Sequence, residues 1–392
     1  MKKLILFLFA LVCSINIINA QWVCVNNGLP SINFVDALAT SGTNIFAGSY
    51  GGGIYLSTND GDLWTAVNTG LTNDTVLSLA ISGTNIFAGT SGGVFLSTNN
   101  GSNWSAVNTG LTNTVVNSLA ISGSNIFAGT KNGIFLSTNN GSSWTAVNNG
   151  LPANTGVYTI IISGINIFAG TIFSGVYLST NNGNNWTAAG LSGNWVNALA
   201  ISGTNIYAGN YYGGMSLSTN NGSSWTPVNN GLSASTNVHS IIINGTNIFA
   251  GTDYSVFLSN NNGGLWTDWN NGIPSYYSAL AFCINGTNIF AGSGNGRVYR
   301  RALSDITEIE ENIDNTSFIL YPNPTKGKFI VTNEINNIDK IEICNMFGEN
   351  IYTSNFKPQI SNEIDISNNP KGIYFVTIYE GEKIHIEKIV VQ

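Results

Sequence analysis

The sequence predicts an all-β protein in which a seven-bladed β-propeller, closed by its N-terminal strand, is followed by a small C-terminal immunoglobulin-like β-sandwich. Three observations predict this fold class. A unit of about 40 residues recurs along most of the chain, each unit holds about four short apolar segments separated by turn residues, and a different series of short segments fills residues 318–392. A period near 40 with four strands per unit is typical of propeller blades.

Two motifs define the repeat. The sequence Asn-Ile-(Phe or Tyr)-Ala-Gly occurs seven times, beginning at Asn44, Asn85, Asn125, Asn166, Asn205, Asn247 and Asn288. The turn motif Ser-x-Asn-x-Gly-x-x-Trp occurs six times, ending at Trp64, Trp104, Trp144, Trp186, Trp225 and Trp266. Its missing counterpart lies at the other end, where residues 21–29, which include Trp22, align with residues 63–71. The repeat is therefore circularly permuted, which predicts a propeller of residues 21–301.

Each unit predicts four strands, which in one copy are residues 76–81, 85–89, 94–97 and 104–107. These segments are apolar on both faces, so each small sheet is expected to be covered on both sides by its neighbours. Residues 22–25 are expected to add the outer strand to the blade formed by residues 279–301. Such closure leaves only short outer edges.

Charge is scarce in the repeat region. Residues 21–301 hold six acidic and four basic residues, so the predicted propeller is nearly neutral. No basic surface of the kind that phosphate backbones require is present, and nucleic acid is not an expected partner. Residues 302–317 lose the repeat and gain Glu308, Glu310, Glu311 and Asp314, which predicts an acidic linker.

The first 20 residues read as a secretory signal peptide, with two lysines, an apolar stretch and a small residue at Ala20. The stretch is too short to span a membrane, and no integral span is expected after its removal. A lipoprotein site at Cys13 is the alternative, although Val12 fits it poorly. Cys24 and Cys283 are expected on the outer and inner strands of one blade, too far apart for a disulfide, so buried thiols are expected.

The turn motif resembles the Asp-box (BNR) repeat of sialidases, sortilin-like propellers and photosystem assembly-factor-like propellers. The Asp of that repeat is Asn in every copy here, and an Asn oxygen can still accept backbone N–H bonds while the Gly supplies a positive φ. A structural role is therefore expected for Ser57, Asn59, Gly61, Trp64, Ser97, Asn99, Gly101, Trp104, Ser137, Asn139, Gly141, Trp144, Trp186, Trp225, Trp266 and Trp22. No copy offers a carboxylate cluster, so neither a metal nor another cofactor is expected.

Catalysis is not expected from the repeat region. Sialidases need clustered arginines and a Tyr/Glu pair, whereas no Glu precedes Glu308 and the arginines sit only at positions 297, 300 and 301. His239 is the only histidine of the region, and a lone histidine is more often structural than catalytic. The chain is thus predicted to be a non-enzymatic binding protein; a divergent sialidase-like glycan hydrolase and a structural or assembly protein that binds another polypeptide are the alternatives.

Strand order places the nearly invariant turns on one face and the varied loops on the other. The varied loops supply the candidate ligand-binding residues, which are Tyr50, Phe173, Trp195, Tyr211, Tyr212, Tyr254, Tyr276, Tyr277 and His239. The second position of the first strand is expected at the mouth of the central channel and reads Asp36, Leu77, Asn117, Tyr158, Asn197, His239 and Leu280. A glycan or a protein is the expected ligand, although drift in unconstrained loops would give the same variety.

The C-terminal segments carry an ordered series of motifs, whose marked positions are Tyr321, Pro322, Asn323, Pro324, Gly327, Gly348, Gly372, Tyr374 and Lys388. Short alternating strands with Gly and Pro turns predict the small β-sandwich of residues 318–392. The series resembles the type A C-terminal sorting domain of the type IX (Por) secretion system of Bacteroidetes. The resemblance implies secretion machinery as a partner and a secreted or outer-surface location, reached via the periplasm. A generic immunoglobulin-like adhesive module is the alternative.

Overall fold

The computed structural model describes residues 21–30, 34–233, 235–274, 277–307, 319–332, 339–346, 348–355, 362–380 and 383–392. The chain divides into two compact units, Met1–Glu308 and Ile309–Gln392. The predicted signal peptide of residues 1–20 and the candidate residue Tyr276 lie outside the described residues. None of the helices in the described part is long and apolar enough to cross a membrane.

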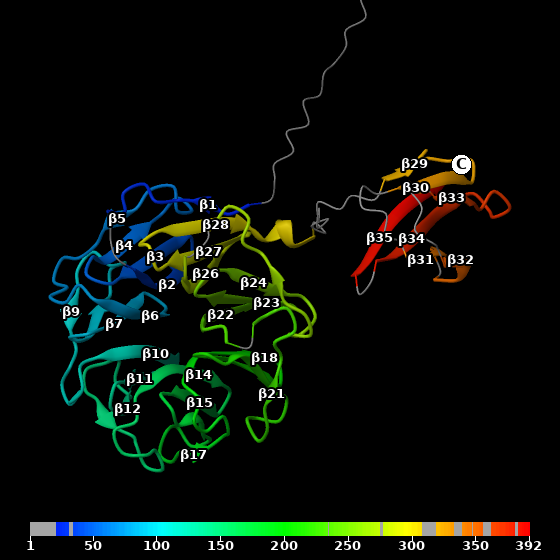
Figure 1. Ribbon diagram of the computed structural model, residues 1–392. Helices are drawn as coiled ribbons and strands as arrows, with labels where there is room; N and C mark the ends of the chain where they lie inside the picture. Colours follow the sequence, from blue (N-terminus) through cyan, green and yellow to red (C-terminus); the bar gives the residue numbers. More distant parts are fainter. Residues whose placement is uncertain are drawn as a thin grey trace, which may run out of the picture. The chain divides into compact units, whose positions relative to one another are not determined.

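The first unit consists of seven four-stranded antiparallel sheets (Figure 1). The first four blades are formed by β2 (Val35–Ser41), β3 (Asn44–Ser49), β4 (Gly53–Ser57), β5 (Thr65–Ala66); β6 (Val76–Ser82), β7 (Asn85–Thr90), β8 (Gly93–Ser97), β9 (Ser105–Ala106); β10 (Val116–Ser122), β11 (Asn125–Thr130), β12 (Gly133–Ser137), β13 (Thr145–Ala146); and β14 (Val157–Ser163), β15 (Asn166–Thr171), β16 (Gly175–Ser179), β17 (Thr187–Ala188).

The last three blades are formed by β18 (Val196–Ser202), β19 (Asn205–Asn210), β20 (Gly214–Ser218), β21 (Thr226–Pro227); β22 (Val238–Asn244), β23 (Asn247–Thr252), β24 (Val256–Ser259), β25 (Thr267–Asp268); and β26 (Ala279–Asn285), β27 (Asn288–Ser293), β28 (Val298–Ala302), β1 (Val23–Cys24). The first strand of every blade packs beside the first strand of the next, and β26 packs beside β2. The sheets therefore form a closed ring, which confirms the seven-bladed propeller.

The repeated Asn-Ile-Phe-Ala-Gly motif forms the second strand of each blade, which is buried from the Ile onward in every copy. Its Gly allows neighbouring blades to approach closely. A Cβ atom at Gly89 would lie 2.7 Å from Cγ1 of Val116 on the next blade, closer than such atoms can come. Burial on both faces of this strand is why the sequence reads as continuously apolar rather than alternating.

The turn motif is held by its own side chains. In the first copy, the Asn59 Oδ1 atom accepts the backbone N–H of Leu63 at 3.0 Å, and the Ser57 hydroxyl accepts the N–H of Gly61 at 2.9 Å. Asn99, Asn139, Asn181, Asn220 and Asn261 accept the corresponding N–H groups in the other copies. The Gly of the motif has a positive φ, 86° at Gly61. An Asn therefore fills the turn as an Asp would.

The tryptophan of each turn links its blade to the preceding one. Each indole Nε1 donates a hydrogen bond to a carbonyl at the end of the preceding blade, in the pairs Trp64–Val25, Trp104–Val67, Trp144–Val107, Trp186–Val147, Trp225–Ala189, Trp266–Val228 and Trp22–Trp269. Six of the seven rings are buried, and Trp225 is partly buried. The ring of blades thus carries a matching ring of indole contacts.

The N-terminal strand completes the last blade, as the permuted repeat predicted. β1 pairs with β28 in antiparallel register, with Val23 opposite Arg300 and Cys24 opposite Tyr299. Beyond the strand, the Val25 N–H donates to the Val298 carbonyl at 2.9 Å. Figure 1 shows β1 along the outer edge of β28.

Two expectations from the sequence need correction. Cys24 is exposed rather than buried, because it lies on the outermost strand of its blade, whereas Cys283 on the innermost strand is buried. Burial raises the pKa of the Cys283 thiol. All three cysteines of the described residues are free thiols, and Cys344 is half-buried.

The second correction concerns the start of the linker, since residues 302–307 continue the propeller unit. A 3₁₀ helix, η1 (Leu303–Thr307), follows β28 directly, and its Leu303 and Ile306 pack against the core of the last blade. The buried Arg301 guanidinium lies 3.9 Å above the Trp269 ring and 3.2 Å from the Asp305 carboxylate. The rest of the predicted linker lies outside the described residues.

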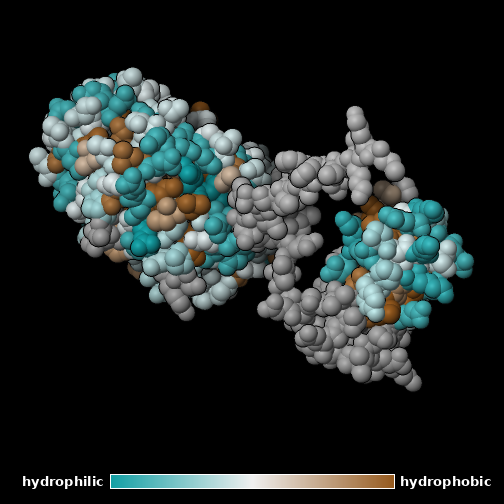
Figure 2. Space-filling view, turned by 90° about the horizontal axis from the view of Figure 1, so that it is seen from above, coloured by the Kyte–Doolittle hydropathy of each residue, from teal (hydrophilic) through white to brown (hydrophobic). Residues whose placement is uncertain are grey.

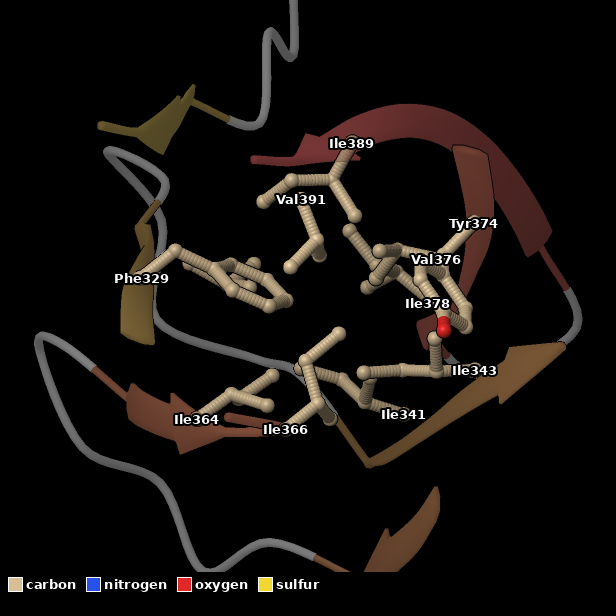
Figure 3. Close-up of a cluster of buried hydrophobic side chains, with 11 residues drawn as sticks. Phe329, Ile341, Ile343, Ile364, Ile366, Tyr374, Val376, Ile378, Ile389 and Val391 are labelled. Atoms are coloured by element: carbon tan, nitrogen blue, oxygen red, sulfur yellow. The ribbon is translucent and has the colours of Figure 1, made fainter. Parts of the chain in front are cut away.

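The second unit is a sandwich of two antiparallel sheets. One sheet contains β29 (Ile319–Tyr321), β30 (Lys328–Thr332) and β33 (Asn362–Asp365), and the other β32 (Asn350–Asn355), β31 (Lys340–Asn345), β34 (Gly372–Glu380) and β35 (Lys383–Val391). Figure 3 shows Phe329 and Ile364 of the first sheet pointing toward Ile343 and Val376 of the second. These side chains belong to one buried cluster, which confirms the predicted β-sandwich.

The C-terminal motif residues meet within this sandwich. The Asn323 side chain donates to the Lys388 carbonyl at 2.7 Å and accepts the Val390 N–H at 3.0 Å, so it holds the last strand in place. Gly327 has a φ of 103°, and a Cβ atom there would lie 2.4 Å from the Ser367 Cα. The Tyr374 hydroxyl donates to the Pro370 carbonyl at 2.5 Å. The motif therefore has a structural basis within the domain.

Candidate functional site

The propeller has one regular face and one varied face. The turn motifs and the turns between the first and second strands lie on the regular face. The first and third strands of a blade run in the same direction, so the turns that follow them lie at the same end of the sheet. The loops between the second and third strands and the connections between blades lie opposite, and we call that side the variable face. Figure 2 shows that the visible hydrophobic residues of the propeller form small patches among hydrophilic ones.

A β-bulge re-aims one side chain in every blade toward the centre of the variable face. In the first blade Val35 pairs with Ser49 and Ala37 with Gly48, so Asp36 is left without a partner in the ladder. The same shift occurs at the second residue of the first strand in every other blade. Bulges turn a side chain out of the regular alternation of a strand.

All seven bulged residues line one cavity of about 460 Å³. They are Asp36, Leu77, Asn117, Tyr158, Asn197, His239 and Leu280, and Phe34 and Tyr50 complete the lining. The strand β2 lies between β26 and β6, so Asp36 is flanked by Leu280 and Leu77. One side of the cavity is therefore lined by an acidic residue between apolar residues, and the other side is lined by polar residues.

Two of the polar residues also join neighbouring blades. The Asn117 amide donates to the Val157 carbonyl at 3.0 Å, and the Asn197 amide donates to the Val238 carbonyl at 3.3 Å. In both pairs the acceptor is the first residue of the next innermost strand. Each bond ties the first strands of two adjacent blades together where they border the cavity.

An aromatic cluster adjoins the cavity; it consists of Tyr158, Phe173, Trp195, Tyr211 and Tyr212. Its centre is Trp195, whose ring centroid lies 5.2 Å from Tyr158, 5.8 Å from Phe173 and 4.7 Å from Tyr211. Tyr212 stacks edge-on against Tyr211 at 4.3 Å. Phe173 and Tyr212 are 66% and 65% exposed. Because Tyr158 belongs to both, the cavity and the aromatic cluster form one continuous surface.

A hydrogen-bonded triplet fixes His239. The Asp253 carboxylate lies 2.5 Å from the His239 Nε2 atom and also accepts a hydrogen bond from the Asn237 amide at 2.5 Å. The Asn237 oxygen in turn accepts the backbone N–H of Tyr212 at 2.6 Å. The triplet thus positions the loop that carries the exposed tyrosine, and it gives His239 a structural partner.

The structure brings most of the predicted ligand-binding residues together. Tyr50 and His239 line the cavity, while Phe173, Trp195, Tyr211 and Tyr212 form the aromatic cluster. Tyr254 is exposed on the neighbouring loop. Tyr277 is different, since it is partly buried and packs against the core of the last blades.

Sequence reasoning placed Asp36 and Tyr158 at the channel mouth without assigning them to a ligand, and it missed Asn237. The signal for the first two was their shared position in the repeat. For Asn237 the only signal was a polar residue directly before a strand, which many loops share.

Burial changes the acidity of two cavity residues. It raises the pKa of the Asp36 carboxyl group to about 6 and raises the pKa of Tyr158. The hydrogen bond with Tyr212 raises the pKa of Tyr211. Within the described ranges, no three or more His, Cys, Asp or Glu residues are grouped so that they could hold a metal ion.

Comparison with protein families identifies the second unit. Residues 319–392 match the family model described as the secretion system C-terminal sorting domain. These residues are a type IX sorting domain. A sorting domain of this kind indicates a protein that is secreted or held at the outer cell surface, and it implies the secretion machinery as a partner. A comparison with curated proteins gives no match.

Solved structures resemble the chain in fold. The extracellular domain of a hybrid two-component system from B. thetaiotaomicron has a TM-score of 0.61 at 17% identity, covering 94% of this chain and 52% of that one. A GH74 xyloglucanase from Xanthomonas campestris has a TM-score of 0.59 at 14% identity, covering 80% and 59%. PorZ, a surface component of the type IX secretion system of Porphyromonas gingivalis, has a TM-score of 0.56 at 14% identity, covering 93% and 60%. This chain spans little more than half the length of these structures.

Proposed function

We propose that the propeller is a non-enzymatic binding module, exported by its sorting domain, whose ligand lies against the aromatic cluster of the variable face. The observation that carries the proposal is the cluster itself. Phe173 and Tyr212 are largely exposed around Trp195, although large apolar rings are normally buried unless they meet a partner. The other ring contacts of the described residues are a buried group, Trp22, Trp269 and Phe249, and the Phe34–Tyr50 pair of the cavity.

A neutral polysaccharide is the first candidate ligand. Aromatic rings stack on the C–H faces of sugars while nearby amide and hydroxyl groups bind the sugar hydroxyls. The nearly uncharged repeat region adds little electrostatic steering. One structural neighbour is itself a xyloglucanase.

The acidic residues of the variable face are poorly placed for glycoside hydrolysis. A glycosidase needs two carboxyl groups on opposite sides of the scissile bond. On the variable face, Asp253 is engaged by His239 and Asn237, Asp36 lies between two leucines, and Asp74 does not line the cavity. A polypeptide surface is the second candidate ligand, and the apolar, acidic side of the cavity favours it.

The test compares variants of the aromatic cluster. Trp195→Ala, and Tyr211→Ala combined with Tyr212→Ala, should each weaken binding to a captured neutral polysaccharide at least tenfold in isothermal titration calorimetry. Ile165→Ala is the matched control, because Ile165 is 72% exposed in a turn of the regular face. Binding should change only mildly between low and high salt. Unchanged affinity in both cluster variants, or binding abolished by salt, would show that this face is not the site.

A further inference from the structure

The apolar side of the central cavity holds one acidic group in an unusual position. Asp36 lies at a bulge between Leu280 and Leu77, and its carboxyl group has no hydrogen-bond or ion-pair partner among the described residues. A carboxylate placed among apolar side chains without a partner is destabilising. Carboxyl groups whose ionisation is disfavoured in this way cluster at functional sites.

Two aromatic rings share the cavity with this carboxyl group. Phe34 and Tyr50 line the same cavity and contact each other edge to face, with their centroids 5.9 Å apart. The backbone N–H of Tyr50 donates to the Phe34 carbonyl at 3.1 Å, which fixes the two loops that carry the rings. Both rings are partly exposed and available to a group that enters the cavity.

We propose that this side of the cavity is a binding site for an alkylammonium group, the group that a lysine side chain of a partner polypeptide carries. The Asp36 carboxylate supplies the opposite charge, and the rings of Phe34 and Tyr50 supply cation–π attraction. Leu77 and Leu280 supply apolar contact for the methylene groups of the stem.

Other cations fit the same residues less well. A divalent ion such as Ca²⁺ takes six to eight oxygen ligands, whereas this side of the cavity offers a single carboxyl group. An amino sugar carries its ammonium on a hydroxylated ring, for which two leucines and two aromatic rings are poor neighbours. The alkyl stem of lysine matches both the charge and the apolar lining.

The inference rests on the proposed role of the variable face as a binding surface, but it does not depend on the aromatic cluster. The two proposals use different residues and different ligands. The experiment therefore avoids Trp195, Tyr211 and Tyr212, so that its failure is separate from a failure to bind polysaccharide.

The probes are three small molecules, titrated into the chain from Gln21 onward and followed by NMR. Nα-acetyl-lysine amide carries the ammonium, Nα-acetyl-norleucine amide keeps an alkyl stem without it, and glucosamine carries an amine on a sugar. We expect the lysine compound to bind at least tenfold more tightly than either of the others.

Variants then locate the site. Asp36→Asn should weaken binding of the lysine compound at least tenfold, and Tyr50→Ala should weaken it about threefold to tenfold. Asp74→Asn is the matched control, because Asp74 is exposed in the connection to the next blade and does not line the cavity. Thermal unfolding checks that each variant is folded, and Tyr50→Ala tests the site without changing Asp36.

Three outcomes would overturn the inference. The first is equal binding of the lysine and norleucine compounds, which would mean that the charge has no role. The second is unchanged affinity in folded Asp36→Asn or Tyr50→Ala, and the third is tighter binding of glucosamine than of the lysine compound.

Discussion

The Trp22 indole donates a hydrogen bond to the backbone carbonyl of Trp269 at 2.7 Å, across 247 residues of sequence. The two rings also meet edge to face, with their centroids 5.4 Å apart. Trp22 lies beside the N-terminal strand of the last blade, and Trp269 belongs to the blade before it. The seam of the ring therefore uses the indole–carbonyl contact that joins the other blades.

Removing the N-terminal strand should open this seam. We expect a chain that lacks residues 21–29 to lose several kcal/mol of unfolding free energy, because it loses a buried Trp, a strand pairing and a protected edge. Circular dichroism during heating measures the change. The single substitution Trp22→Phe is a milder variant, expected to cost about 1 kcal/mol for the lost hydrogen bond. A truncated chain that melts at the temperature of the intact chain would contradict the closure.

The tryptophans of the turn motif should differ in their contribution to stability. The Trp104 ring is buried. The Trp225 ring is only partly buried. Trp104→Ala should therefore cost about 3–4 kcal/mol in urea unfolding, and Trp225→Ala about 1–2 kcal/mol less than that.

Ligand affinity at a temperature where both Trp variants are folded provides the control. It should match that of the unchanged chain, because the turn motif lies on the regular face. Equal destabilisation by the two substitutions would show that burial of the ring does not determine how much each tryptophan contributes to the free energy of unfolding.

Asp36 should make stability depend on pH. Burial raises its pKa from 3.8 to about 6 in the folded protein, so the folded state binds more protons than the unfolded state between these values. The unfolding free energy therefore falls as pH rises through this window. Asp36→Asn should raise it by about 3 kcal/mol at pH 7.5 and change it little near pH 4. If Asp36→Asn changed the unfolding free energy by the same amount at both pH values, titration of Asp36 would be excluded as the source of the pH dependence.

Export should depend on the sorting domain. A chain truncated after Thr307 keeps the contacts of η1 with the last blade, so it should fold and remain in the periplasm. Immunoblots of periplasmic and outside fractions measure its location, and the full chain is the control. Truncation after Arg301 is a poorer choice, because it leaves a buried guanidinium without the Asp305 carboxylate. Normal amounts of the shorter chain outside the cells would refute the prediction.

Much of the fold follows from the sequence because repetition supplies many copies of one pattern. The alignment of residues 21–29 with residues 63–71 was enough to predict β1 as the last strand of the ring. The shared position of Asp36 and His239 in their repeats placed both at the channel mouth. The predicted start of the linker, residue 302, was wrong. The acidic composition begins near Asp305, but Leu303 and Ile306 still pack against the propeller.

The geometry of the site was harder to predict from the sequence. The bulge at Asp36 is set by the pairing of its neighbours with Ser49 and Gly48, a register that composition does not reveal. The exposure of Cys24 depends on which edge of a blade faces solvent. Tyr277 was expected at a ligand site because aromatic loop residues can face either a ligand or the core, and only packing distinguishes them.

The pairing of β1 with β28 also has a consequence for the order of events during biogenesis. A nascent chain is made from its N-terminus, so β1 has no partner until the last blade has been synthesised. An interrupted chain, however long, keeps an unpaired first strand and an uncovered blade at its break. Closure of the ring through this pairing therefore has to wait until β28, the third strand of the last blade, has been made.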